Sequence, residues 1–279
     1  MKHLKNHHLL LQISLLALVC LLTITGLSGC GHHDNSVSNI KKKGTLVMGT
    51  AAEADYAPFE FSIVKNKHQV IVGYDIMVAQ KIAKHLGVKL KVQNMEFASL
   101  FTELQNHKVD MALAGITKTK QREKAVDFSK PYYKSKDVLM VRKADANKYN
   151  HPADANGKQI GVEKSSTEEM IAKKDLKAKL VNEQLTASLA TDLKAGKLDG
   201  VVTSDTVADK YVAKYPNDYA IAKVHLKMPA ELQDIDIALP KNQPALKKEV
   251  NEEIVHLQKT GQLKKMFKQA QKIQNENDK

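Results

Sequence analysis

One short pattern occurs twice in the chain, and it constrains the fold more than any other feature. Residues 100–114 have the spacing of a helix, pass through Lys-Val-Asp at residues 108–110 and end in an apolar strand. Residues 189–203 follow the same order, with Lys-Leu-Asp at residues 197–199. Two copies of a helix-to-strand unit predict an α/β chain made of two similar lobes.

The length and composition agree with a two-lobed exported chain. A chain of 279 residues is long enough for two domains of ordinary size. With 43% hydrophobic and 5% aromatic residues it is typical of a soluble α/β protein. Its two cysteines, Cys20 and Cys30, both lie near the N-terminus, so the body of the chain has no disulfide and no cysteine-based metal site.

The N-terminus is predicted to direct export. Its apolar run at residues 9–22 follows two lysines and is too short to span a membrane, as in a signal peptide. Residues 27–30 (Leu-Ser-Gly-Cys) resemble the lipobox of bacterial lipoproteins, whose cysteine is acylated and becomes the new N-terminus. We therefore expect residues 1–29 to be removed and Cys30 to anchor the protein to the outer face of the cell membrane. An ordinary secretory signal cut nearby is the alternative.

Residues 30–43 are predicted to form a polar tether. Their histidine pair, His32 and His33, lacks further ligands, and no metal site or other cofactor is expected. Removal of residues 1–29 takes away two of the 43 basic residues and none of the 31 acidic ones, which leaves a net charge of +10. Export and the scattered lysines argue against nucleic acid, whereas a basic surface suits anionic lipid or wall polymer.

The stretch at residues 108–136 is predicted to hold the functional centre. Its apolar strand breaks at Gly115, where the backbone can approach another group closely, and Arg122 offers a fork that matches a carboxylate. Open α/β sheets place their ligands just past the carboxyl ends of the strands. The helix start at residues 165–169 is a second candidate anion site, because hydroxyl and acidic residues suit a cap there. A surface arginine and a plain cap are the simpler alternatives.

These motifs resemble the polar amino-acid family of extracellular solute-binding proteins that serve ABC importers, known as solute-binding protein family 3. The matching pieces, in family order over about residues 44–270, are Tyr56 to Phe61, Gly73 to Ile76, Leu104 to Asp110, Thr117 to Arg122, Val126 to Tyr133, Ser166-Thr167, Leu198-Asp199 and Ala238 to Lys241. The resemblance implies a type II periplasmic-binding-protein-like α/β fold, with two hinge strands joining the lobes and the ligand cleft between them. A large lobe at residues 44–135 and 240–279 and a small lobe at residues 136–239 are expected.

The resemblance also implies the ligand contacts. Arg122 matches the arginine that pairs with the ligand α-carboxylate, and Thr117 matches the residue that binds the same group through its N–H and hydroxyl. The other implied positions are the backbone at Ala114 and Gly115, the pair Tyr56 and Phe97 around the ligand side chain, and the small-lobe cap at Ser166 and Thr167.

Two positions depart from the family pattern, and a third bears on which ligand is bound. The acid that holds the ligand α-ammonium in the family falls on Ser204, and Asp205 comes one residue later. Either a one-residue bulge brings Asp205 into the cleft or Ser204 takes a weaker role. Ser165 stands where the family commonly has glycine. Glu53 lies where relatives with cationic ligands place an acid, which favours arginine, lysine or histidine unless Glu53 is a solvated loop residue.

The predicted function is that of a monomeric, lipid-anchored receptor. It binds a free polar amino acid, cationic or glutamine-like, and delivers it to ABC permease subunits without chemistry. A dehydratase-like enzyme on the same fold is one alternative, with Glu53 and Asp205 as the evident acid or base candidates. A surface adhesin is another, motivated by the charge and the tether. The sequence leaves open which amino acid is bound.

Overall fold

The computed structural model describes residues 34–52 and 56–277. Residues 35–279 cluster as one compact unit. The predicted signal segment, Cys30 and Glu53 lie outside the described residues, so their roles stay predictions. Within the described residues, no helix combines the length and the apolar character that a membrane crossing requires.

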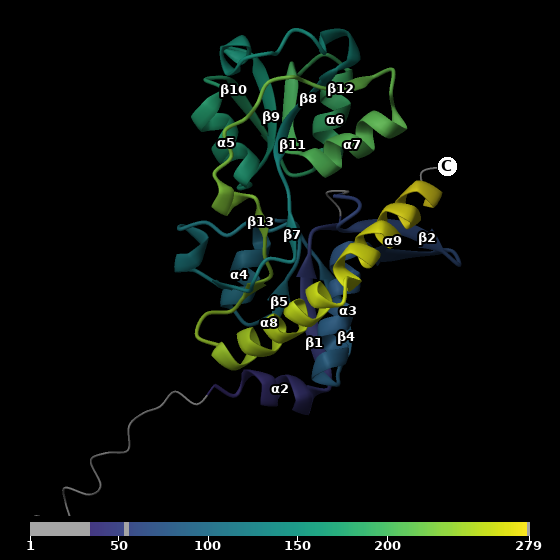
Figure 1. Cartoon of the computed structure of the whole chain (residues 1–279), viewed down its shortest axis with the longest axis vertical. Helices are drawn as coiled ribbons and strands as arrows, with labels where there is room; N and C mark the ends of the chain where they lie inside the picture. Colours follow the sequence, from purple (N-terminus) through teal and green to yellow (C-terminus); the bar gives the residue numbers. More distant parts are fainter. Residues whose placement is uncertain (1–33, 53–55, 278–279) are drawn as a thin grey trace, which may run out of the picture. The chain divides into compact units, whose positions relative to one another are not determined.

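Two five-stranded sheets organise the compact unit (Figure 1). The first sheet has the order β4 (Lys89–Asn94), β1 (Thr45–Thr50), β5 (Met111–Ala112), β14 (Ala238–Leu239) and β6 (Asp127–Phe128). The second has the order β10 (Lys179–Glu183), β9 (Gln159–Glu163), β11 (Gly200–Ser204), β8 (Asp137–Arg142) and β12 (Tyr219–Ile221). The first sheet with its helices is called lobe 1, and the second sheet with its helices is called lobe 2. The predicted two-lobed α/β fold is confirmed.

Helices pack against the first sheet. The helices of lobe 1 are α2 (Ser36–Lys43), α3 (Tyr74–Leu86), α4 (Ser99–Gln105), α8 (Pro244–Lys259) and α9 (Gln262–Asn277). Both α8 and α9 pack against α3, and α4 packs against β1 and β5. The largest apolar cluster of the core includes Ile82 of α3 and Ile254 of α8, each fully buried. A hairpin of β2 (Phe61–Lys65) and β3 (His68–Val72) extends from this lobe.

Lobe 2 is covered by α5 (Thr167–Asp175), α6 (Thr186–Lys194) and α7 (Asp205–Lys214). The strands β10, β9 and β11 run parallel, whereas β8 and β12 pair with their neighbours antiparallel. As a result, the first residue of β8 lies at the same edge of the sheet as the last residues of β9 and β11.

The repeated sequence unit forms the same structure in both lobes. In lobe 1 the Asp110 carboxylate accepts the Val47 N–H at 2.7 Å at the start of β1, and in lobe 2 Asp199 accepts the Gln159 N–H at 2.9 Å at the start of β9. A partly exposed aspartate thus ties each helix-to-strand turn to the neighbouring strand.

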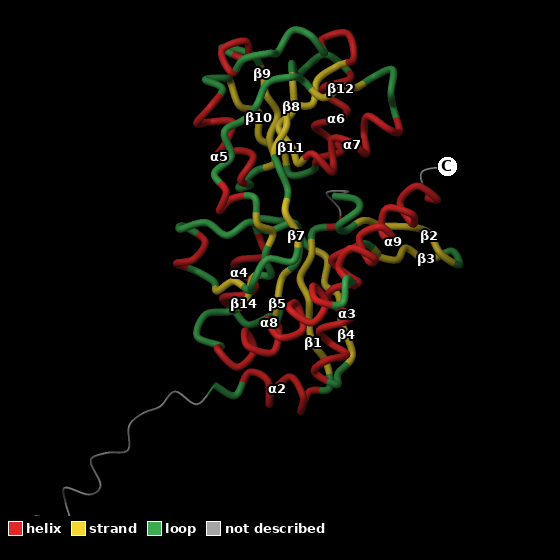
Figure 2. The backbone as a smooth tube through the Cα atoms, in the orientation of Figure 1, coloured by secondary structure: helices red, strands yellow, loops and turns green. Residues whose placement is uncertain are grey.

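Two short strands lie between the sheets (Figure 2). These strands, β7 (Tyr133–Lys134) and β13 (Asp234–Ile235), pair antiparallel and carry the chain from lobe 1 to lobe 2 and back. The strand β14 then joins the first sheet next to β5. The expected small-lobe boundary at residue 239 is therefore too late, because residues 238–239 belong to the sheet of lobe 1.

The expected tether also ends earlier than the sequence suggested. Residues 36–43 form helix α2, which ends at Gly44 in a left-handed turn and packs against α8. Its one buried apolar residue, Ile40, is 3% exposed and joins the core of lobe 1. Its two apolar residues, Val37 and Ile40, are three positions apart among polar residues, which is too little periodicity to predict such a helix.

Candidate functional site

Loops from three strand ends of lobe 1 form one side of the site. Tyr56 follows β1, Phe97 follows β4, and residues 114–117 follow β5. Because β1 runs parallel to both β4 and β5, these three strands end at the same edge of the sheet. The fold therefore brings together the residues predicted for this lobe.

Arg122 lies at the centre of this side. One guanidinium nitrogen, Nη1, donates to the Thr117 carbonyl at 2.7 Å, and the guanidinium carbon is 5.2 Å from the ring centre of Phe97 and 5.0 Å from that of Phe101. Removal from water lowers the pKa of Arg122 to about 10, against the opposing attraction of Glu168 and Glu163. Among the described residues no carboxylate oxygen lies within ion-pair distance of the guanidinium, so the site presents a half-buried cation to an incoming anion.

The backbone and surroundings of residue 115 strongly favour glycine. Its φ is +57°, and a Cβ atom there would lie 2.7 Å from Cε1 of the Tyr56 ring. Its N–H donates to Asp75 Oδ2 at 3.3 Å. The neighbouring Ala114 and Thr117 are 4% and 2% exposed, and Thr117 pairs with Ile235 of β13. The tyrosine ring and the glycine backbone are thus in direct contact, as the predicted cleft wall requires.

Lobe 2 contributes the helix cap that the sequence predicted. Ser166 is the N-cap of α5, and its Oγ accepts the Glu169 N–H at 3.0 Å. The residue before it, Ser165, has a φ of +65°, and its carbonyl accepts Nη2 of Arg122 at 2.9 Å. Thr167 begins the helix and is 6% exposed. The cap therefore meets Arg122 directly.

A cleft of about 510 Å³ opens beside this contact. Its lining comes from both lobes and includes Phe101, Arg122, Ser165, Ser166, Met170 and Lys173. A small polar ligand can therefore reach Arg122 from solvent.

Ser204, and not Asp205, occupies the position opposite Tyr56. The strand β11 pairs with β8 in unbroken register up to Ser204 opposite Asp137, so the bulge that would bring Asp205 into this position is absent. Ser204 is 1% exposed, caps α7 and lies next to the Tyr56 side chain. Asp205 instead accepts the Thr206 N–H at 2.8 Å and Ser135 Oγ at 3.3 Å, next to the crossing strands.

Three carboxyl groups of lobe 2 at this edge were missed by the sequence reasoning. They are Asp137 at the start of β8, Glu163 at the end of β9 and Glu168 in the first turn of α5, and they are called the acidic group below. The Tyr56 hydroxyl donates to Glu168 Oε1 at 3.4 Å, which connects the two lobes. Each of the three acids lies at the end of a strand or in the first turn of a helix, which is the signal that could have revealed them.

Burial and mutual repulsion keep two of these carboxyls protonated. Desolvation, followed by the charges of Glu168 and Asp205, raises the pKa of Asp137 to about 9. Desolvation and the charge of Glu168 raise the pKa of Glu163 to about 8, although Arg122 opposes the shift. At neutral pH, Asp137 and Glu163 are therefore mostly uncharged in this arrangement.

A second pair of buried acids lies behind the cleft wall. The carboxyl groups of Glu60 and Asp75 lie close enough to act on each other, and Tyr132 donates its hydroxyl to Asp75 Oδ1 at 2.8 Å. Burial raises the pKa of Asp75 to about 6 and raises that of Glu60 as well. Because Asp75 also holds the Gly115 N–H, this pair fixes the backbone on which Tyr56 rests.

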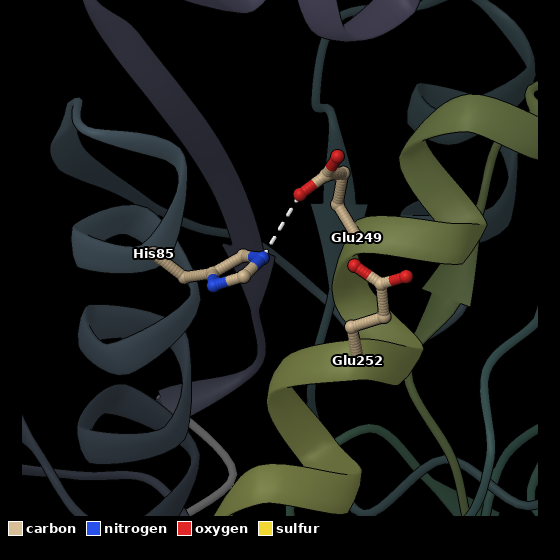
Figure 3. Close-up of side chains that lie close together, drawn as sticks. All are labelled: His85, Glu249 and Glu252. Atoms are coloured by element: carbon tan, nitrogen blue, oxygen red, sulfur yellow. Dashed lines mark hydrogen bonds and ion pairs between the residues drawn. The ribbon is translucent and has the colours of Figure 1, made fainter.

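One group among the described residues has the ligand set for a metal ion. His85, Glu249 and Glu252 place their ligand atoms within 4.8 Å of one another (Figure 3). The His85 ring is 2.9 Å from Glu249, which an ion pair between α3 and α8 explains without a metal. His85 is ten residues after Asp75 on α3, about 15 Å along the helix axis, so this group is separate from the cleft.

Comparison with known proteins identifies the family. The family model for "Bacterial extracellular solute-binding proteins, family 3" matches residues 46–271. The chain is 32% identical to the arginine-binding extracellular protein ArtP of Bacillus subtilis over 257 residues, which cover 91% of this chain and 96% of that protein. It is 26% identical to the L-cystine-binding protein TcyJ of Escherichia coli over 252 residues, covering 90% and 91% of the two chains.

The solved structures agree with this assignment. An amino acid ABC transporter substrate-binding protein from Streptococcus pneumoniae, bound to L-arginine, is 38% identical and superimposes with a TM-score of 0.80. The match covers 84% of this chain and 97% of that one. With the fold, the cleft and the sequence in agreement, the chain belongs to the bacterial extracellular solute-binding proteins of family 3.

Proposed function

We propose that this protein is the extracellular receptor of an ABC importer and that it binds a cationic α-amino acid, arginine in the first place, between lobes 1 and 2. The observation that carries the proposal is the Arg122 side chain, a half-buried guanidinium with carbonyl partners and no carboxylate partner among the described residues. A ligand carboxylate would supply that partner, and hydrogen bonds to charged groups contribute about 1.5–3 kcal/mol each.

The charges around the cleft support a cationic ligand. The carboxyl groups of Glu168 and Glu163 act electrostatically on Arg122, and Asp137 starts its strand at the same edge of lobe 2. An amino acid with a neutral side chain brings one cationic group, its α-ammonium, whereas arginine brings two. The names of ArtP and of the arginine-bound structure support the same choice.

Delivery is proposed to work through the contacts that join the lobes. Arg122 reaches Ser165, and Tyr56 reaches Glu168, so a ligand that binds both sides favours the arrangement in which these contacts form. The lipid anchor at Cys30, the monomeric state and the permease partner are part of the proposal. The proposed role involves no turnover, so bound arginine should be recovered unchanged from the protein.

The test is thermal melting of the mature protein against the twenty amino acids, ornithine and cystine. A ligand at one hundred times its Kd adds about 2.7 kcal/mol to the free energy of unfolding. We expect arginine to raise the melting temperature and Arg122→Ala to abolish the rise. Lys118→Ala removes a nearby positive charge that is 46% exposed and should leave the rise intact. A melt that no amino acid shifts would reject the receptor function.

A further inference from the structure

The acidic group of lobe 2 has unused hydrogen-bonding capacity. Among the described residues, Asp137 Oδ2 and Glu163 Oε1 are buried and have no hydrogen-bond partner. Asp137 as a whole is 8% exposed. A buried carboxyl oxygen without a donor is unfavourable, so these two oxygens indicate a place for donors that a ligand brings.

The groups that face these oxygens come from every neighbouring element. Glu168 of α5 acts on both Asp137 and Glu163, and Asp205 of α7 acts on Asp137. Lobe 1 contributes Arg122, which faces Glu163 and Glu168. The remaining neighbours are the Tyr56 hydroxyl, Ser204, and Glu183 of β10, which stands opposite Glu163 in register. Among these described groups, the cation Arg122 faces an excess of acids, and protons balance the charge when no ligand is bound.

We propose that Asp137, Glu163 and Glu168 receive the cationic side-chain group of the ligand and that its arrival displaces a proton from Asp137 or Glu163 into solvent. This inference rests on the proposed function, because the ligand is assumed to be an α-amino acid held by Arg122. The proton leaves a carboxyl oxygen, and the ligand cation takes over its role as charge partner and hydrogen-bond donor.

A guanidinium group fits this acidic group better than a neutral amide. It offers five N–H donors and no acceptor, so it can serve several carboxylate oxygens at once. A ureido group of the same shape carries an oxygen that would face the acids and has no charge to favour their ionised form. L-citrulline is therefore the matched neutral probe for L-arginine.

The sign of the pH dependence follows from the raised pKa values. In the empty protein Asp137, with a pKa of about 9, and Glu163, with a pKa of about 8, hold their protons at neutral pH. A bound cation lowers both pKa values, so binding releases protons and affinity rises with pH. Between pH 6 and pH 8 we expect the affinity for L-arginine to rise by up to about tenfold per pH unit for each proton released. The affinity for L-citrulline should stay flat.

Isothermal titration calorimetry of the mature protein tests this directly. Titrations with L-arginine at pH 7 in buffers of different ionisation enthalpy should show proton release, and those with L-citrulline should show none. Glu163→Gln and Asp137→Asn should each reduce the release and lower the affinity for L-arginine at least tenfold relative to that for L-citrulline. Glu231→Gln changes an exposed glutamate of the same lobe and should change neither quantity.

The outcomes separate this inference from the proposed function. If L-arginine binds through Arg122 without proton release, or L-citrulline binds as tightly, the acidic group is not the cation subsite and the receptor function stands. If no α-amino acid binds, both fail together. Should a variant not fold, the pH series on the unchanged protein still decides, because a flat affinity for L-arginine between pH 6 and pH 8 overturns the inference.

Discussion

The two lobes share one structural unit but differ in charge where they meet the ligand. Asp110 and Asp199 tie equivalent turns to equivalent strands, and Gly49 and Gly161 lie under equivalent helices. At the strand ends the likeness stops, because lobe 1 presents the cation Arg122 while lobe 2 presents carboxyl groups. The comparison teaches that the repeated unit supplies the frame and that the loops past the strand ends supply opposite halves of the recognition chemistry.

The strongest way to break this comparison is to remove one half of the ligand at a time. Agmatine is arginine without its carboxylate, so it should bind at least one hundred times more weakly than L-arginine, given about 1.5–3 kcal/mol for each charge-assisted hydrogen bond that is lost. Calorimetry or competition melting measures the ratio.

The Arg122→Ala variant supplies the control for that prediction. It should weaken L-arginine strongly and change agmatine little, because agmatine has no group for lobe 1 to hold. Equal losses for the two compounds would mean that Arg122 does not bind the carboxylate, and the division of roles between the lobes would be wrong.

A prediction with a smaller effect tests whether side chains pack equally closely around the repeated unit in both lobes. A Cβ atom on Gly161 would lie 2.7 Å from both Leu189 and Leu198, whereas one on Gly49 would lie 2.9 Å from Leu100. Overpacking of this kind costs about 1–3 kcal/mol. Urea unfolding should show Gly161→Ala to be more destabilising than Gly49→Ala. The reverse order would show that the core of lobe 2 yields more easily than that of lobe 1.

The smallest effect concerns the cap that touches Arg122. Ser165 has a left-handed backbone with a φ of +65°, and its contacts with Arg122 and Glu169 are made by its own carbonyl and N–H. Ser165→Gly keeps both contacts and relieves the backbone, so it should raise the free energy of unfolding by at most about 1 kcal/mol. Lys164→Gly has no such strain to relieve and should lower it. A loss of stability in both variants would contradict the assignment of strain to Ser165.

The sequence was sufficient for the frame and for most of one side of the cleft. The repeated turn predicted two lobes, and Arg122, Gly115 and the Ser166 cap lie where strand ends and helix starts placed them. These positions could be predicted because each depends on residues close together in the chain. The pairing of Ser204 with Asp137 decided against a bulge at Asp205, and register between distant strands has no local signal.

The acidic group escaped prediction for a related reason. Residues 137, 163 and 168 come together only because β8 runs antiparallel to β11 and therefore to β9. This direction brings the start of β8 to the same edge as the ends of the other two strands. Each acid alone is an ordinary polar residue at the end of an element. Their shared effect on protonation depends on burial between neighbouring elements, which sequence spacing does not report.

The paired crossing strands β7 and β13 have a consequence for protein engineering and for evolution within the family. The chain leaves lobe 1 and returns to it through neighbouring strands, which lie about 4.8 Å apart in any sheet. Residues 135–233 are therefore a cassette with adjoining ends, which can be exchanged between relatives at two nearby junctions. A chimera that keeps Arg122 of the host for the ligand α-carboxylate should take its preference for the ligand side chain from the protein that donates the cassette.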